Sequence, residues 1–174
     1  MIPESVLRER FTVTREVTLR VCRGDDLPAL EWFGLFTAHR EIIRSVYDSQ
    51  ESGEAIMLVA EVQGFPIGQV WIDLIRKSVD ATGVLWAVRV FPILQNLGIG
   101  TRLMAAAEEV LRYHACAYAE LGVEQDNPDA KRFYERQCYR VVGRMQGEYG
   151  YTTPDGQATR VPTDQWILRK PLAQ

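Results

Sequence analysis

The hydrophobic and polar positions in the first half of the chain predict a strand, a helical region and three further strands. Apolar and polar residues alternate over 17–22, which is typical of a half-buried strand. Apolar runs over 55–62 and 66–75 flank a short turn and predict a hairpin, and a loop over 76–83 leads to a fourth strand over 84–92. Between the first strand and the hairpin we expect a helical region, broken near Gly34, and a loop over 49–54. The apolar residues of this region are Trp32, Phe33, Leu35, Phe36, Ile42, Ile43 and Val46.

Helices and strands alternate in the second half of the chain. Apolar residues recur at helical spacing from Ile99 to about Ala115, and a strand-like run follows over 117–124. Asn127 is a natural N-cap and Pro128 suits the first helical position, so we expect a short helix to begin there.

The end of the chain contains a turn at Pro154-Asp155-Gly156. This turn predicts that 147–153 folds back onto 157–161 as a hairpin, and a last strand is expected over 166–170. The whole order, βααβββαβαββ, predicts an α/β fold of three layers, α/β/α, around a central mixed sheet.

The sequence QNLGIGTRLM, over 95–104, joins the fourth strand to the long helix through Gly98 and Gly100. Glycine accepts positive φ and lets a ligand approach the main chain. The amides of 97–101 then lie at the positive end of the helix dipole, where a phosphate or pyrophosphate binds well. The alternative is an ordinary turn that needs glycine only for its geometry.

Three motifs in this order resemble the GNAT superfamily of acetyl-CoA-dependent N-acyltransferases. They are V-x-P at Val90 and Pro92, Q-x-x-G-x-G at Gln95, Gly98 and Gly100, and N-x-x-A-x-x-x-Y at Asn127, Ala130 and Tyr134. Cys138 and Tyr139 stand where the family usually has glycine and phenylalanine. The likeness runs from about Thr18 to Lys170, and it implies the family's fold, with the fourth and fifth strands splayed apart to admit the cofactor.

The resemblance also implies acetyl-CoA as co-substrate, with no metal. The glycine turn would hold its diphosphate through main-chain amides, and the fourth strand would bond to the pantetheine arm. The cofactor-binding set so implied is Val88, Val90, Gln95, Asn96, Leu97, Gly98, Ile99, Gly100, Thr101, Arg102, Asn127 and Tyr134. Gln95 replaces a frequent arginine. Arg102 is a further phosphate ligand or a solvated residue, and Arg89 is a substitute charge or a surface residue.

Tyr134 matches the tyrosine that the family places beside the cofactor sulfur, so its catalytic role would be to protonate the leaving thiolate. The alternative is a packing role. The general base is unassigned: 84–90 holds no carboxylate, and Asp73 and Glu61 are the candidates, each with a structural or solvated role as the alternative. The acceptor pocket implied by the fold is built from Trp32, Phe33, Phe36, His39, Tyr149 and Tyr151.

Length and composition predict a single domain over 1–174, with a loosely held lead-in over 1–14 and an extra hairpin over 144–165. A net charge of −3 argues against nucleic-acid binding, and no apolar run has membrane-spanning length. Three widely spaced cysteines argue against disulfides and structural zinc and for a cytoplasmic location. His39 and His114 have no partner spacing for a metal or a triad, so we expect both to be structural.

Three functions are compatible with these features. The favoured one is acetyl transfer to a primary amine of a small molecule or peptide, by a monomer or a homodimer. The second is a non-catalytic acyl-CoA-binding or sensing module, which the missing carboxylate on the fourth strand supports. A dinucleotide-binding domain is weakest, because the glycine turn follows a late strand and no acidic residue has the ribose spacing.

Overall fold

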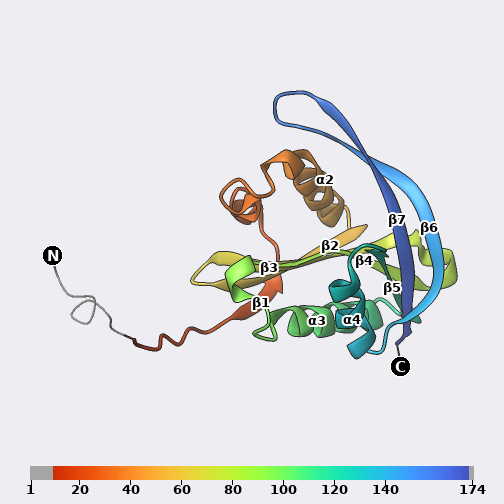
Figure 1. The fold of residues 1–174 in the computed structure, drawn as a ribbon, viewed down its shortest axis with the longest axis horizontal. Coiled ribbons are helices and arrows are strands. Elements are labelled where there is room, and N and C mark those ends of the chain that lie inside the picture. The colour runs from red at the N-terminus through yellow and green to blue at the C-terminus, as the bar shows by residue number, and fades with distance from the viewer. Residues whose placement is uncertain (1–9, 173–174) are drawn as a thin grey trace.

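The computed structural model of the protein describes residues 10–172 and is built around a seven-stranded sheet in the order β1-β2-β3-β4-β5-β7-β6 (Figure 1). The strands are β1 (Thr18–Val21), β2 (Ala55–Val62), β3 (Phe65–Lys77), β4 (Thr82–Val90), β5 (Tyr118–Glu124), β6 (Arg140–Thr152) and β7 (Ala158–Pro171). The helices are α2 (Arg40–Glu51), α3 (Ile99–Tyr113) and α4 (Pro128–Arg136). Strands β4 and β5 are parallel and the other neighbours are antiparallel, so the predicted mixed α/β sheet is confirmed.

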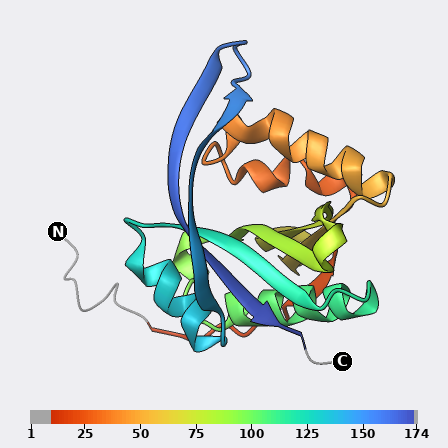
Figure 2. The same cartoon turned by 90° about the vertical axis from the view of Figure 1, so that its right-hand side faces the viewer.

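Helices cover both faces of the sheet (Figures 1 and 2). Helix α2 lies on one face, and α3 and α4 lie on the other. Beneath α3 the core contains fully buried side chains such as Leu85, Leu103 and Leu111. A smaller core beneath α2 contains Ile43 and Trp71. Each helix therefore buries its apolar stripe against its own side of the sheet.

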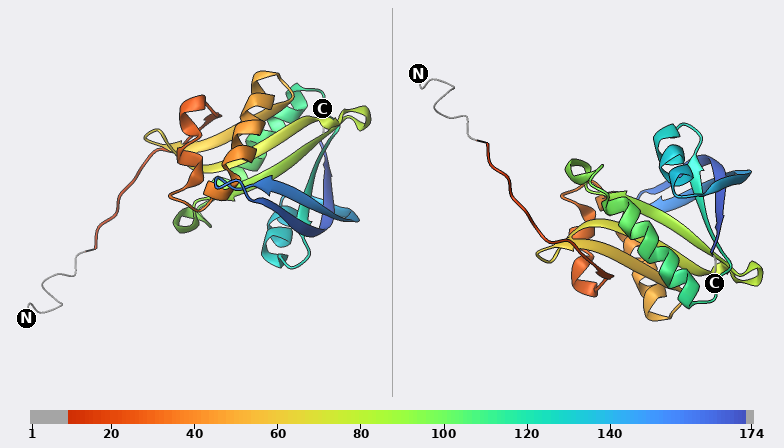
Figure 3. Two further views of the ribbon diagram at one scale, coloured as in Figure 1. Left: turned by 90° about the horizontal axis from the view of Figure 1, so that it is seen from above. Right: turned by 90° about the horizontal axis from the view of Figure 1, so that it is seen from below.

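Strands β4 and β5 separate halfway along their length. They pair from Thr82 with Tyr118 to Leu85 with Leu121, and beyond Leu85 strand β4 pairs only with β3. The register between β3 and β4 shifts next to Ala87, whose φ of +50° marks a bulge. The strands therefore splay as expected, and one edge of β4 is left without a neighbouring strand (Figure 3).

The region before α2 differs from the prediction. Short 3-10 turns at 24–26, 29–31 and 37–39 replace the first predicted helix. Trp32 and Phe33 take left-handed φ angles of +45° and +57°, which stop helical growth. The indole of Trp32 is buried and donates to the Pro66 carbonyl at 2.8 Å, so a distant contact decides the local backbone. The predicted loop over 49–54 is also wrong at its start, because α2 continues to Glu51.

Strands β6 and β7 form one long hairpin that extends past the sheet toward α2 (Figures 1 and 2). It includes the predicted turn at 154–156, and the returning strand predicted over 157–161 and the last strand predicted over 166–170 belong to one continuous strand, β7. Near its tip, the Tyr151 ring stacks on His39 with ring centres 4.8 Å apart. Residues 10–17 form no helix or strand, and the rest of the predicted lead-in lies outside the described residues.

Candidate active site

A cleft of about 810 Å³ opens where β4 leaves β5. It is bounded by the end of β4, the turn after it, the start of α3, and α4. Nine of the predicted cofactor-binding residues line it: Val88, Val90, Gln95, Asn96, Gly98, Gly100, Thr101, Asn127 and Tyr134. The fold thus brings together two motifs that lie about thirty residues apart in the sequence.

The glycine turn gives the cleft an end rich in backbone donors. Gly98 has a φ of +82°, and its carbonyl accepts the first α3 hydrogen bond, from the Arg102 amide at 3.1 Å. The amides of 99–101 precede that bond and have no partner inside the helix. A Cβ on Gly100 would lie 3.3 Å from the Phe133 ring, so this position is tight on its α4 side. The amides without a helical partner make this helix start suitable for an anion.

Strand β4 presents backbone groups along its open edge. The Phe91 amide donates to the Ile67 carbonyl of β3 at 2.7 Å. Because successive residues of a strand direct their backbone groups to opposite sides, the amides of Val90 and Val88 face away from β3. The Val90 carbonyl accepts a bond from Gln95 Nε2 at 3.1 Å, which ties the turn to the strand end.

Three predicted cofactor-binding residues do not line the cleft with the others. Leu97 is exposed, Ile99 is buried in the core beneath α3, and Arg102 is exposed. The backbone amides of Leu97 and Ile99 stay predicted ligands, but the structure does not bring the Arg102 side chain to the cleft. Besides Arg89, the cleft is lined by Arg132 and Arg136 of α4, one helical turn apart, which the sequence did not single out.

The two α4 residues singled out from the sequence both border the cleft. Asn127 caps the helix, its Oδ1 accepting the Ala130 amide at 3.0 Å. Tyr134 is 9% exposed and packs against Phe133 and Tyr139. Burial raises the pKa of Tyr134 to about 12, so its phenol carries its proton at neutral pH. Its hydroxyl has no hydrogen-bond partner among residues 10–172, which suits a group that gives a proton to a ligand.

Both carboxylates considered as general base are already engaged. Asp73 accepts the amides of Ile75 and Arg76 at 3.1 and 2.8 Å and pairs with the Arg76 side chain at 3.2 Å. Glu61 pairs with Arg20 at 3.5 Å at the β1–β2 edge of the sheet, away from the β4–β5 splay. Neither is held as a free base beside the cleft.

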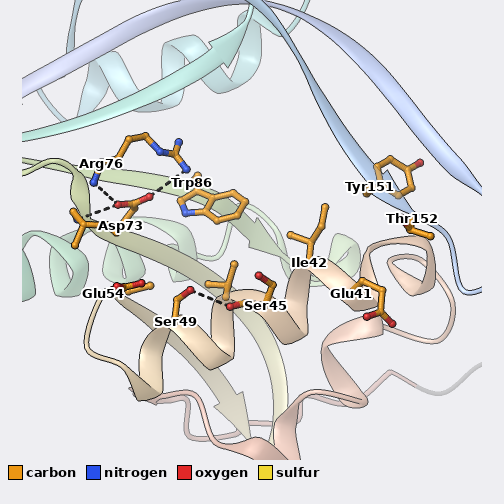
Figure 4. A pocket seen from close by; sticks show the side chains of 13 residues that line it. Glu41, Ile42, Ser45, Ser49, Glu54, Asp73, Arg76, Trp86, Tyr151 and Thr152 are labelled. Atoms are coloured by element: carbon orange, nitrogen blue, oxygen red, sulfur yellow. Dashed lines mark hydrogen bonds and ion pairs between the residues drawn. The ribbon is translucent and has the colours of Figure 1, made fainter.

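A second pocket of about 380 Å³ lies on the α2 side of the sheet (Figure 4). It is lined by α2, the start of β2, the end of β3, Trp86 of β4, and the tip of the β6–β7 hairpin. Three carboxylates, those of Glu41, Glu54 and Asp73, are among its lining residues, with Trp86 and Tyr151. These carboxylates make the pocket lining acidic, and Arg76, which also lines it, offsets the charge of Asp73.

Only Tyr151 of the predicted acceptor residues lines this pocket. Trp32 is buried against Pro66, and Phe33 stacks on Phe65 with 86% of its surface exposed. Trp32 and Phe33 therefore pack the entry to α2, because the left-handed backbone at 32–33 turns them toward β3.

Arg89 is half-buried rather than a surface residue, and although it borders the cleft, its guanidinium lies among aromatic rings. Its guanidinium carbon lies 4.1 Å from the centre of the Phe36 ring and 5.6 Å from that of Trp71, on the α2 side of the sheet. Burial lowers its pKa. Burial, and then the Arg89 charge, lower the pKa of His39, so the imidazole is neutral at pH 7.

The cleft and its glycine turn agree with the comparisons to known proteins. The model of the acetyltransferase (GNAT) family matches residues 25–138, about two thirds of the chain. The chain belongs to the GNAT acetyltransferase family. A curated relative, the uncharacterized N-acetyltransferase YhfO of Bacillus subtilis (strain 168), is 27% identical over 135 residues, which cover 71% of this chain and 89% of that protein.

Solved GNAT structures share the fold at low identity. The ribosomal-protein-S18-alanine N-acetyltransferase of Escherichia coli superposes with a TM-score of 0.69 at 19% identity, covering 91% of this chain and 96% of that one. The acetyltransferase yncA of Salmonella typhimurium, solved with acetyl-CoA, gives 0.70 at 18% identity, covering 91% and 95%. Both likenesses show the fold alone.

Within residues 10–172 of this acetyltransferase, no group of three or more His, Cys, Asp or Glu side chains is arranged to hold a metal ion. None of the helices in that range is long and apolar enough to cross a membrane. Cys22, Cys116 and Cys138 are free thiols, and burial raises the pKa of Cys22 and Cys116.

We predict that His39 titrates below its ordinary pKa of 6.5 and that Arg89→Met raises its pKa, because the arginine charge opposes protonation. Stability contributed by neutral His39 should be complete above pH 6.5 and lost as the pH falls through the lower folded pKa. Imidazole nitrogen NMR across pH measures both values, and His114→Gln assigns the two histidines. A His39 pKa at or above 6.5, or one unmoved by Arg89→Met, would contradict the burial and charge described above.

Proposed function

We propose that the protein transfers the acetyl group of acetyl-CoA to a primary amine by direct attack in a ternary complex. The observation that carries this proposal is the cleft at the β4–β5 splay, with unpaired helix amides at one end and a buried tyrosine beside it. The acetyl-CoA in the related yncA structure supports the choice of donor. The acceptor is a small molecule or a peptide, and a cytoplasmic location belongs to the same proposal.

Successive parts of the cleft match successive parts of the acetyl-CoA molecule. The amides of 99–101, with Arg132 and Arg136, match the negative diphosphate. The open edge of β4 matches the amide-rich pantetheine arm, which would add hydrogen bonds there as an extra strand does. When bound, acetyl-CoA supplies an activated thioester carbonyl.

Tyr134 donates a proton to the leaving thiolate. The amine nitrogen forms a bond to the carbonyl carbon, the carbon–sulfur bond breaks, and the sulfur takes the phenolic proton. The Tyr134 phenolate then regains a proton from solvent, and the attacking nitrogen, which carries one extra proton after bond formation, releases it to water to give the neutral amide. An alkylamine has a pKa of about 10 and must first lose a proton to become a nucleophile. Since Asp73 and Glu61 are engaged, we assign that proton to water rather than to a carboxylate.

The second pocket, with its carboxylates, is the proposed binding site for the acceptor amine. Glu41, Glu54 and Asp73 line the pocket beside α2, and they would attract a cationic amine (Figure 4). Arg76 balances one of these charges by pairing with Asp73. The pocket meets β4 at Trp86, the first residue beyond the β4–β5 pairing.

A non-catalytic acyl-CoA-binding module is the second candidate. The observation that favours it is the absence of a carboxylate from 84–90 together with the engaged state of Asp73 and Glu61. Release of free thiol from acetyl-CoA in the presence of a panel of amines separates the two. An enzyme consumes acetyl-CoA only when an acceptor is present, whereas a sensing module binds it without turnover.

Gly100→Glu should abolish CoA binding, because the new side chain brings bulk and negative charge to the amides of the helix start. CoA at about 100 times its Kd should stabilise the parent by about 2.7 kcal/mol, which is several degrees in Tm. Gly143→Glu is the control, since nothing lies within 4 Å of its Cβ and it is outside the cleft. A folded Gly100→Glu variant that keeps the CoA-dependent shift would mean that the diphosphate binds elsewhere.

Tyr134→Phe should lower kcat about 100-fold, the usual effect of losing one positioned acid, and leave the KM for acetyl-CoA within about twofold. Tyr139→Phe is the matched control: that phenol is also buried, but it donates to Glu108 Oε1 at 3.1 Å and lies outside the cleft. Its loss should reduce stability by about 1 kcal/mol and spare kcat. Steady-state kinetics that return a Tyr134→Phe rate within about twofold of the parent would assign Tyr134 to packing.

A further inference from the structure

Strand β6 is a long strand at one end of the seven-stranded sheet, and within residues 10–172 only β7 pairs with it (Figure 1). The strand at the other end, β1, has four residues, whereas β6 has thirteen, and every residue of 140–150 is exposed. Native proteins usually shorten or protect such edges, because half of the backbone groups lack a partner in the sheet. Residues 143–149 contain neither proline nor lysine and stay in regular register with β7. This segment is therefore open to pairing with another strand.

The charges along this edge are complementary to those of a second, antiparallel copy of the same edge. With Gln146 opposite itself, Arg144 of each copy lies opposite Glu148 of the other, so two pairs of opposite charge cross between the strands. A centre at Arg144 or at Glu148 would instead oppose two like charges, which is destabilising. No other centre between these two residues opposes charges of opposite sign. The charge pattern therefore selects one register of self-pairing.

Each crossing pair would extend an ion pair that the hairpin already contains. Arg144 Nε donates to Asp164 Oδ1 at 2.7 Å, and Arg160 pairs with Glu148 at 2.9 Å. Both partners lie in β7, on the side of β6 away from its free edge. Across two copies the charges would alternate in sign over four strands, in the order Asp164, Arg144, Glu148 and Arg160. Such a network contributes more than isolated exposed ion pairs, which contribute little.

On the other face of the strand, the same register sets large side chains opposite glycines. Met145 lies opposite Gly147, and Tyr149 lies opposite Gly143. Met145 and Tyr149 are 51% and 44% exposed, so both have apolar surface left to bury. Among the described residues, a Cβ on Gly143 would have no atom within 4 Å, and one on Gly147 would meet only Thr163 Oγ1, at 3.7 Å. The space over each glycine can therefore hold the opposing side chain, as aromatic residues cover edge-strand glycines elsewhere.

We propose that the protein is a homodimer in which 143–149 of β6 pairs antiparallel with the same segment of a second copy, about a two-fold axis at Gln146. A second copy is the occupant because this one sequence supplies both members of every matched pair. A two-fold contact of this kind uses both edges and closes, so assembly stops at two copies. The register shift between Val141 and Gly143 ends the paired segment on one side. The inference does not depend on the acetyl transfer proposed above.

The dimer contact adjoins the second pocket. Tyr149 stacks on Tyr151 with ring centres 6.2 Å apart, and Tyr151 lines that pocket and stacks on His39. Met145 of the second copy is the diagonal neighbour of Tyr149, within reach of a long side chain, and methionine sulfur packs well on aromatic rings. The second copy would therefore support the aromatic stack that covers the pocket.

Arg144→Glu and Glu148→Arg should each raise the dissociation constant of the dimer about 10-fold or more, because like charges then face each other at both crossing pairs. Light scattering on the full chain over a range of concentrations measures this constant, and the parent should have twice the mass of one chain. Arg160→Glu is the matched control: it sets like charges side by side within one hairpin but leaves 144 and 148 unchanged, so it should stay dimeric.

An equal mixture of Arg144→Glu and Glu148→Arg should recover the dimer as a heterodimer. The two arginines of one copy then face the two glutamates of the other, so both crossing pairs are restored. Recovery on mixing also shows that each variant is folded. An affinity tag on one variant captures the other when the heterodimer forms.

Gln146→Cys tests the centre of the contact independently, with Cys138→Ser removing the exposed thiol of the parent. Opposed residues of antiparallel strands have Cα atoms about 4.5–5.5 Å apart, which is within disulfide range. Mild oxidation should link the two copies, whereas Gln157→Cys at the hairpin turn should stay unlinked, because the two hairpin tips point away from each other.

A parent that has the mass of one chain up to about 100 μM would overturn the proposal. A dimer that both charge reversals leave intact, that does not recover on mixing, or that Gln146→Cys fails to link would show that the copies meet at another surface, and would overturn it equally.

Discussion

The site depends on the loss of pairing between β4 and β5 after Leu85. A parallel pair that continued would use the backbone groups of β4 for its own hydrogen bonds and would close the sheet. The bulge at Ala87 and the departure of β5 toward β7 leave those groups free at the centre of the protein. The interior of the sheet thus contains an unpaired strand edge. Such edges usually promote aggregation, but here a ligand can form hydrogen bonds with the free backbone groups of β4.

Beyond the bulge, one short strand serves both faces of the sheet. Val88 and Val90 pack toward the α3 core and border the cleft, whereas the Arg89 guanidinium reaches the α2 side. The bulge re-aims these side chains, because the extra residue shifts the alternation after Trp86. The proposed acetyl-CoA cleft and the proposed acceptor pocket therefore lie on either side of a single strand, β4. The β6–β7 hairpin covers the acceptor pocket, where Tyr151 of the hairpin stacks on His39.

The elements around the glycine turn could be predicted because their signals are local: Gly98 needs its positive φ, and Asn127 caps its own helix. The backbone before α2 could not be predicted, because the position of Trp32 is fixed by its hydrogen bond to the Pro66 carbonyl in β3, far along the sequence. Cys138 adopts a φ of +69°, so the conformation that the family's glycine provides is kept without glycine. The burial of Arg89 depends on Phe36 and on the bulge, neither of which a linear pattern reveals.

Amide hydrogen exchange with and without CoA tests most directly whether the open edge of β4 and the start of α3 bind the cofactor. The amides of Val88 and Val90 and those of 99–101 should exchange more slowly when CoA is bound, because they gain acceptors. Those of 82–85, already within the β4–β5 pairing, should change little. Protection confined to α2 and the hairpin tip, with none at 88–101, would contradict the account.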